Sequence, residues 1–161
     1  MKIFCNKILF LICALCLFMF SACSEVDSQV SGTLEKAPEF TLENMQGAEV
    51  RLSELLKDDK KVVLVFFTTW CVYCVREIPE VNNFYQQNMD KAHVYGINIQ
   101  ESKKKVEAFA ESKGIKYPII FDTDGRVASL YGIRGIPAVI GIDKDGSLVY
   151  RGHNVEGMDS E

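Results

Sequence analysis

The sequence is poor in cysteine beyond its first 23 residues. Four of its six cysteines lie in that opening segment: Cys5, Cys13, Cys16 and Cys23. The rest of the chain keeps only Cys71 and Cys74, three positions apart. Any thiol chemistry in the main part of the chain must therefore come from this one pair.

An excess of positive charge is also absent. The formal net charge is −4 at pH 7, and it becomes −6 without residues 1–23, which contain Lys2 and Lys7 and no acidic residue. Such a charge argues against nucleic acid as the partner, because a phosphate backbone is bound mainly by cationic side chains.

Internal repeats and low-complexity segments are missing too. With 161 residues, the chain has room for one domain with one core.

No apolar run reaches the ~20 residues that a bilayer-spanning helix needs. The run Ile8 to Phe20 has 13 residues, follows two lysines and precedes Ser21-Ala22-Cys23. This pattern predicts an export signal over residues 1–23. Phe20 to Cys23 resembles a bacterial lipobox, with Phe20 in place of the usual leucine. The resemblance implies that Cys23 is lipidated and becomes the mature N-terminus.

Two other interpretations of this segment stay open, an uncleaved N-terminal anchor and an ordinary secretory signal in which Cys23 is incidental. All three place the following domain outside the cytoplasm, facing the periplasm or another extracytoplasmic space. That location is oxidising, so a lone dithiol there is either kept reduced by a dedicated donor or acts as an oxidant. Residues 24–36 are polar and predict a flexible tether. Residues 37–161 are expected to form the domain.

The segment from Trp70 to Cys74 sets its two thiols one helical turn apart, directly after the apolar run Val62 to Phe67. That run suits a strand covered on both faces. Apolar residues spaced by three or four predict a helix from Cys71 to about Asn88. A thiolate at Cys71 would then meet unpaired N–H groups and the positive end of the helix dipole. We therefore expect Cys71 to be the nucleophile and Cys74 the resolving thiol.

Two interpretations without redox chemistry also exist for this cysteine pair. A static disulfide between near neighbours constrains little of the unfolded chain. Half of a zinc site would need two further ligands, for which only His93 and His153 remain. The redox interpretation is favoured, with no metal and no cofactor expected.

The remaining pattern predicts a βαβ unit followed by a hairpin. Beyond the first strand and helix, the expected elements are a strand at Val94 to Ile99, a helix from Ser102 to Lys113, and strands at Tyr117 to Phe121, Ala138 to Ile142 and Leu148 to Arg151. Residues 41–52 predict a short N-terminal hairpin.

This order, with Cys-x-x-Cys at a helix start, resembles the thioredoxin fold. The opening Ala37 to Leu42 and the segment Cys74 to Pro79 resemble more narrowly the TlpA/ResA-like family of exported, membrane-tethered thioredoxins. The resemblance covers Ala37 to about Gly152. It implies an α/β fold with a central mixed sheet flanked by helices and an N-terminal β-hairpin. The C-terminal helix of that fold is expected to be missing or truncated, since only His153 to Glu161 remain for it.

The resemblance also implies roles for individual residues. Pro137 matches a cis proline that faces the cysteines, and Ile136 before it would pair with an extended substrate segment; the alternative is an ordinary trans proline. Glu77 matches an acid that ResA-like proteins use near their thiols, and its alternative role is to favour the helix dipole. Trp70 would shield the thiols and contact a substrate, or simply pack at the edge of the core.

The predicted function is a membrane-anchored thiol-disulfide oxidoreductase outside the cytoplasm, acting as a reductase. The resemblance implies protein disulfide substrates, including apocytochromes c, and a membrane thiol as electron donor. Two alternatives remain. Thr68 and Cys71 fit the Thr-x-x-Cys of a thiol peroxidase, although Leu64 stands where that motif wants proline. A copper metallochaperone would use both cysteines and His153.

Overall fold

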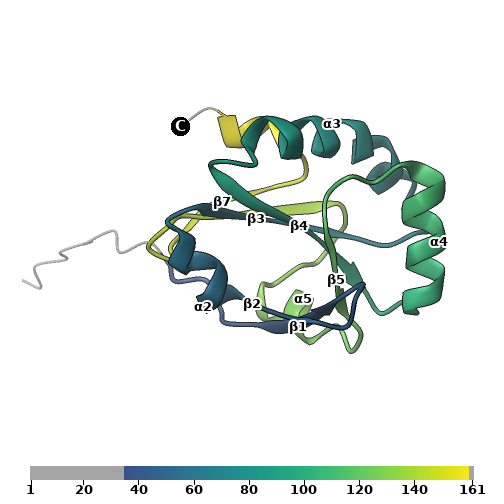
Figure 1. Cartoon of the computed structure of the whole chain (residues 1–161), viewed down its shortest axis with the longest axis horizontal. Helices are drawn as coiled ribbons and strands as arrows, with labels where there is room; N and C mark the ends of the chain where they lie inside the picture. The colour runs from purple at the N-terminus through teal and green to yellow at the C-terminus, as the bar shows by residue number, and fades with distance from the viewer. Residues whose placement is uncertain (1–34, 160–161) are drawn as a thin grey trace, which may run out of the picture. The chain divides into compact units, whose positions relative to one another are not determined.

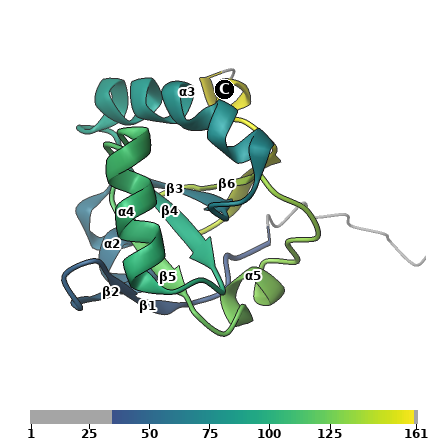
Figure 2. The same ribbon diagram turned by 90° about the vertical axis from the view of Figure 1, so that its right-hand side faces the viewer.

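The protein is described by a computed structural model that covers residues 35–159 (Figures 1 and 2). The predicted export signal, Cys23 and most of the predicted tether lie outside the described residues. The helices and strands are β1 (Thr41–Asn44), β2 (Glu49–Arg51), α2 (Leu52–Leu55), η1 (Leu56–Asp58), β3 (Lys61–Phe67), α3 (Val72–Asn88), β4 (Ala92–Ile99), α4 (Lys103–Lys113), β5 (Ile119–Asp122), α5 (Arg126–Leu130), β6 (Ala138–Ile142), β7 (Leu148–Gly152) and η2 (Glu156–Asp159).

The strands form one mixed sheet in the order β2-β1-β5-β4-β3-β6-β7. Strands β3, β4 and β5 are parallel, which the intervening helices α3 and α4 make possible. Strand β6 is antiparallel to β3, and β7 to β6. The βαβ unit, the final hairpin and the N-terminal hairpin are therefore confirmed, and so is the α/β thioredoxin-like architecture with a mixed sheet.

Strand β3 is buried on both faces, as its unbroken apolar run predicts. Leu64 and Phe66 point into a core with α5 and the N-terminal segment, which includes Tyr131 and Phe40. Val63 and Val65 point to the opposite face and contact the apolar side of α3. Figures 1 and 2 show this layering, with α3 on one side of the sheet and α2 and α5 on the other.

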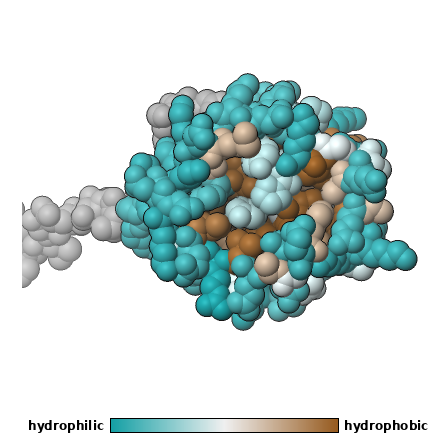
Figure 3. All heavy atoms as spheres, in the orientation of Figure 1, coloured by the Kyte–Doolittle hydropathy of each residue, from teal (hydrophilic) through white to brown (hydrophobic). Residues whose placement is uncertain are grey.

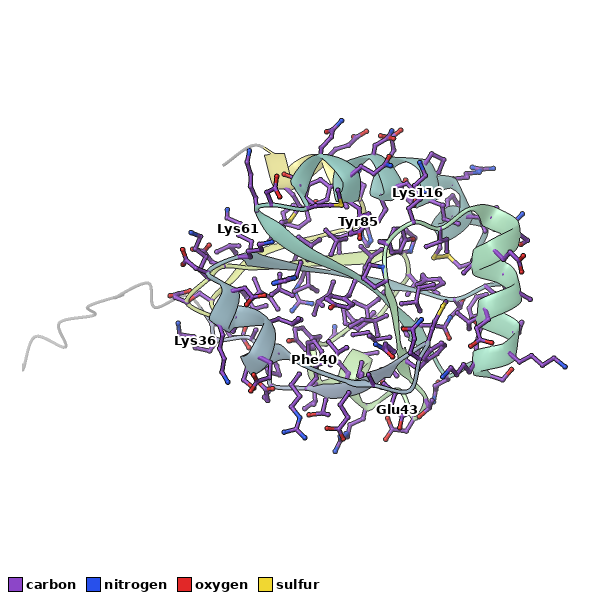
Figure 4. All side chains as sticks on the ribbon, viewed as in Figure 1. Lys36, Phe40, Glu43, Lys61, Tyr85 and Lys116 are labelled. Carbon is purple, nitrogen blue, oxygen red and sulfur yellow. A yellow bond between two sulfur atoms is a disulfide. The ribbon has the colours of Figure 1, made fainter. Side chains whose placement is uncertain are left out.

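The N-terminal segment is fixed to the end of the sheet where β3 begins. The Glu35 carbonyl oxygen accepts the Leu148 N–H at 2.8 Å, and Lys36 Nζ donates to the Asp145 carbonyl oxygen at 2.7 Å. Figure 4 shows Lys36 at the same end as Lys61, the first residue of β3, while Phe40 points inward. The dithiol follows the other end of β3, so the two features lie at opposite ends of the sheet.

The chain after β7 turns back over the face that carries α3. Val155 is buried, and Met158 packs so closely on Gly141 of β6 that a Cβ there would lie 2.8 Å from its sulfur. The last described element is the short 3-10 helix η2 rather than a longer α-helix. Among residues 35–159, no helix combines the length and apolarity needed to cross a bilayer.

Polar side chains surround the apolar ones on the surface. Figure 3 shows one face of the molecule, on which hydrophobic residues are visible mainly in the middle and hydrophilic residues surround them. The described domain also exposes three large apolar or aromatic side chains in one short stretch: Trp70, Val72 and Tyr73. These three flank the cysteines.

Candidate active site

Cys71 occupies the N-cap of α3. Its backbone is extended, with φ −79° and ψ 106°, and its sulfur accepts the backbone N–H of Cys74 at 3.1 Å. A sulfur at this position satisfies one of the N–H groups that a helix leaves unpaired at its start. The two cysteines are joined by a disulfide, with their Cα atoms 5.2 Å apart. The spacing of the pair therefore matches a redox disulfide at a helix start.

The sulfur atoms lie beneath a surface of exposed side chains. Cys71 and Cys74 are only 6% and 5% exposed, whereas Trp70 is 69% and Tyr73 68% exposed. The guanidinium of Arg76 lies 5.6 Å from the centre of the Tyr73 ring, within the range of a cation–π interaction. A partner that reaches the disulfide would thus meet flat apolar groups first.

The Ile136–Pro137 bond is cis, as predicted. The Ile136 carbonyl oxygen lies 3.7 Å from the Cys71 sulfur. The structure therefore brings this loop, which is 65 residues away in the chain, to the disulfide.

His153 lies behind the same loop. Its Nδ1 is 2.9 Å from the Pro137 carbonyl oxygen. A carbonyl oxygen only accepts, so Nδ1 carries the proton in this contact.

A hollow of about 590 Å³ opens beside the loop, and its walls include Trp70, Arg134 and Ile136. Ile136 and Trp70 are thus both close enough to the dithiol to contact a substrate.

Glu77 lies one turn after Cys74 on α3 and is half-buried. Burial, followed by repulsion from Glu156 and Glu80, raises the pKa of its carboxyl above the ordinary value. A raised pKa makes the carboxyl take up a proton more readily than an ordinary glutamate does. The catalytic role of Glu77 remains a prediction.

A second carboxylate near the dithiol was not expected from the sequence. Glu101, in the loop after β4, has a side chain that is only 6% exposed. Its oxygens accept the backbone N–H of Thr69 and the Thr69 hydroxyl, both at 2.6 Å. They also accept from Asn98 at 2.9 Å and from Lys105 at 2.6 Å.

These hydrogen bonds decide the charge of Glu101. Burial by itself raises the pKa of this carboxyl, but the hydrogen bonds from Lys105, Thr69 and Asn98 outweigh it and lower the pKa to about 2. A lowered pKa means that the ionised form stabilises the fold above the ordinary pKa near 4.5 and that this contribution is lost as pH falls toward 2. The Thr69 loop is therefore held by an anion at every pH near neutrality.

One sequence signal could have located Glu101. It follows a buried strand, parallel and adjacent to β3, by two residues. The carboxyl ends of neighbouring parallel strands meet at one edge of a sheet, which is where sites form. The spacing from the cysteines points only to Glu77 on α3, because Glu101 is distant from them in the chain.

The comparisons with known proteins agree with this geometry. Residues 33–151 match the model of the AhpC/TSA family. The Thiol-disulfide oxidoreductase ResA of Bacillus subtilis is 33% identical over 143 residues, which is 88% of this chain and 78% of the relative. ResA of Geobacillus thermodenitrificans is 36% identical over 113 residues, 70% of this chain. The match spans only 64% of the length of that second relative.

Solved structures show the same fold. The thioredoxin domain of a thiol-disulfide oxidoreductase from Bacteroides vulgatus superposes with a TM-score of 0.68 at 22% identity, covering 74% of this chain and 87% of that one. A thiol:disulfide interchange protein from Bacteroides sp. gives a TM-score of 0.67 at 24% identity, covering 74% and 80%. The thioredoxin-like fold is confirmed.

The N-cap geometry generates a prediction about thiol reactivity. In the reduced protein, the Cys71 thiolate would keep the Cys74 N–H and the helix dipole as partners, so its pKa should lie below the ~8.5 of a free cysteine. We expect iodoacetamide at pH 7 to alkylate Cys71 at least about tenfold faster than Cys74. Mass spectrometry of the singly modified protein measures the ratio, with the Cys71→Ser variant as control. Equal rates at the two thiols would contradict the assignment of Cys71 as nucleophile.

A second prediction concerns Glu77. If its carboxyl exchanges protons with the buried thiol, Glu77→Gln should change the pH dependence of Cys74 alkylation between pH 5 and 8. The same variant should be no less stable at pH 7 in urea unfolding, because the raised pKa means that ionised Glu77 is disfavoured in the folded protein. Glu107→Gln, an exposed acid on α4, is the matched control. If the pH dependence of Cys74 alkylation is unchanged in Glu77→Gln, Glu77 does not exchange protons with the thiol, and only its favourable interaction with the helix dipole remains.

Proposed function

Because the chain belongs to the AhpC/TSA family and, within it, to the ResA-like thiol-disulfide oxidoreductases, we propose that it reduces disulfide bonds of exported proteins outside the cytoplasm. The observation that carries this proposal is the position of the dithiol. Cys71 sits at the N-cap of α3 with its sulfur on the Cys74 N–H, and the cis Ile136–Pro137 loop lies against it.

The reaction follows from that arrangement. The Cys71 thiolate attacks one sulfur of a substrate disulfide, and the other substrate sulfur leaves as a thiolate that takes up a proton. Cys74 then loses its proton and attacks Cys71 in the mixed disulfide, which releases the substrate as a dithiol. The protein is left with the Cys71–Cys74 disulfide, oxidised by two electrons. A dithiol donor must reduce it again, and we propose a thiol carrier in the membrane for this role.

Substrate binding is proposed to use the loop beside the disulfide. The backbone of Ile136, next to the cis proline, can pair with an extended segment, as an added strand does at a sheet edge. Trp70 and Tyr73 offer apolar contacts around the sulfur atoms. The Cys-x-x-Cys-His segments of apocytochromes c are one class of extended disulfide substrate that this surface would accept.

The location is proposed from the sequence. Residues 1–23 have the pattern of an export signal, and Cys23 is proposed to carry the lipid that anchors the domain to the membrane. An exported domain would work in an oxidising space, and this is why it needs its own electron donor.

The two alternative functions have less support from the geometry. A thiol peroxidase would use the Thr68 hydroxyl beside the attacking cysteine, but the buried Thr68 Oγ1 has no hydrogen-bond partner within residues 35–159. A copper chaperone would need His153 beside both cysteines. Groups of three or more metal-ligating side chains are absent from the described part of the chain.

The direction of electron flow is testable. No histidine lies between the cysteines, and Val72 and Tyr73 add no positive charge to the thiolate. Strong oxidants reach about −120 mV by stabilising their reduced form, whereas thioredoxin lies near −270 mV, a gap of roughly 7 kcal/mol for two electrons. We expect a potential nearer the thioredoxin value, measured against glutathione or dithiothreitol buffers, and rapid reduction of insulin disulfides when a chemical dithiol is supplied.

The cysteine variants are the controls for that assay. Cys71→Ser should abolish insulin reduction, and Cys74→Ser should accumulate a mixed disulfide through Cys71, which can also capture partners in the native membrane. A potential above about −180 mV, the value of protein disulfide isomerase, would make the protein an oxidant or isomerase instead.

Membrane anchoring is tested separately. In Cys23→Ser, the acyl attachment site is lost, so the protein should either leave the membrane fraction or accumulate as an unprocessed precursor. Fractionation and intact-mass measurement report the outcome, with Cys16→Ser as the matched control inside the apolar run. A Cys23→Ser protein that matures and fractionates like the wild type would exclude the lipoprotein.

A further inference from the structure

The reaction scheme above gives no role to Glu101, although this carboxylate is the most fully hydrogen-bonded acid near the dithiol. Four donors converge on its two oxygens, two of them from Thr69. Hydrogen bonds to an ionised acceptor are about twice as strong as neutral ones. A group with so many strong contacts fixes whatever it binds, and Thr69 lies two residues before Cys71.

The backbone before Glu101 is held in an unfavourable conformation. Gln100 has φ 54°, in the left-handed region that non-glycine residues rarely occupy. It is kept there by its N–H, which donates to the Asp122 carbonyl at 2.9 Å, and by its side-chain amide, which donates to the Asp124 carbonyl at 3.2 Å. Such strain persists only where the surrounding structure imposes it, and it often marks a functional site. Here the turn after β4 places Glu101 against the loop that follows β3.

The loop from Thr68 to Cys71 holds the first residues of α3 in place. The Thr68 carbonyl oxygen accepts the Cys71 N–H at 3.3 Å, and Cys71 in turn caps α3. While the disulfide is closed, the bond to Cys74 also fixes the Cys71 side chain. Once the disulfide is reduced, that covalent restraint disappears, and the sulfur stays at the N-cap only through the loop and the Cys74 N–H.

We propose that Glu101 is a positioning residue, which holds the Thr69 to Cys71 loop so that the amino end of α3 stays directed at the Cys71 sulfur after the disulfide opens. This proposal rests on the proposed dithiol chemistry. Glu101 does not touch the sulfur or the substrate, and its effect passes through the N–H and hydroxyl of Thr69. The role therefore differs from that of Glu77, which is proposed to move protons.

A direct electrostatic effect of the Glu101 carboxylate on the Cys71 thiolate would change the reactivity of Cys71 in the opposite direction from a loss of positioning. A carboxylate near a thiolate repels it and raises the thiol pKa, so removing the carboxylate should make Cys71 more reactive. Loss of positioning should make Cys71 less reactive, because the freed loop no longer aligns the N–H groups and the helix dipole with the sulfur. The sign of the change in Cys71 reactivity thus separates the two effects.

The test is the alkylation rate of reduced Cys71 in Glu101→Gln, measured between pH 5 and 9 so that the thiol pKa is obtained. The glutamine keeps the size of the side chain but presents an NH₂ group where two donors now bind. We expect the pKa of Cys71 to rise and alkylation at pH 7 to slow about fivefold or more. An unchanged or faster rate would overturn the proposal.

Neighbouring threonines supply a gentler pair of variants, in case Glu101→Gln does not fold. Thr69→Val removes only the hydroxyl that donates to Glu101, and it should slow Cys71 alkylation about two- to threefold, whereas Thr69→Ser should restore the wild-type rate. Thr68→Val is the matched control, because the buried Thr68 hydroxyl has no partner among the described residues. If Thr69→Val and Thr68→Val give equal rates, the proposal is wrong.

A last comparison removes the ion pair and keeps the loop contacts. Lys105→Gln deletes the cation bound to Glu101 at 2.6 Å and leaves both Thr69 hydrogen bonds in place. Its Cys71 rate should stay within about twofold of wild type, and a loss as large as that of Glu101→Gln would contradict the proposal. Alkylation needs no substrate, so these results stand even if the wild-type protein fails to reduce insulin, which would count against the proposed function alone.

Discussion

The site depends on one constraint, the pairing of β3 on both of its edges. Parallel pairing with β4 and antiparallel pairing with β6 place Phe66 of β3 beside Ala138 of β6. The dithiol loop leaves the end of β3, and the cis Ile136–Pro137 loop enters β6 at the same level. Two segments that are far apart in the chain thus meet because the register of β3 against β6 brings these strand ends together. Burial of β3 on both faces makes that register costly to change.

The arrangement of polar and apolar groups around the sulfur atoms suits a protein that reacts with other proteins. The cysteines are nearly buried, which protects the disulfide, whereas Trp70, Val72 and Tyr73 remain largely exposed beside them. Exposed aromatic groups around a protected reactive centre are typical of surfaces that bind a partner before reacting with it. In the proposed substrate contact, the backbone of Ile136 would add polar groups that pair with any extended segment, whatever its side chains.

Two carboxyl groups near the dithiol have opposite electrostatic environments. Glu77 has its pKa raised by burial and by Glu156 and Glu80, and this favours the protonated form. Glu101 binds the loop just before Cys71, and its four donors hold it as an anion. Where the environments of two carboxyl groups move their pKa values in opposite directions, the two groups commonly have different roles. Here the raised pKa suits a group that transfers protons, and the lowered pKa suits one that holds the structure.

The sequence by itself determined the elements and the dithiol. The apolar run of residues 62–67 predicted the central strand, the spacing of apolar residues predicted α3, and the pair of cysteines at its start predicted a redox site. These features are local, so they can be seen in the order of residues. The thioredoxin-like fold was implied by the resemblance of their order to that fold.

Only the tertiary structure decided which residues Glu101 and His153 contact near the dithiol. Glu101 lies 32 residues from Thr69 in the chain, and His153 lies 16 residues from Pro137. Its position two residues after β4 marks the edge of the sheet, but nothing in the local sequence shows that this acid binds Thr69. Its role depends on the left-handed turn at Gln100 and on the alignment of β4 with β3. Long-range hydrogen bonds of this kind form only once the sheet has brought the strand ends together, so no pattern within a single segment can predict them.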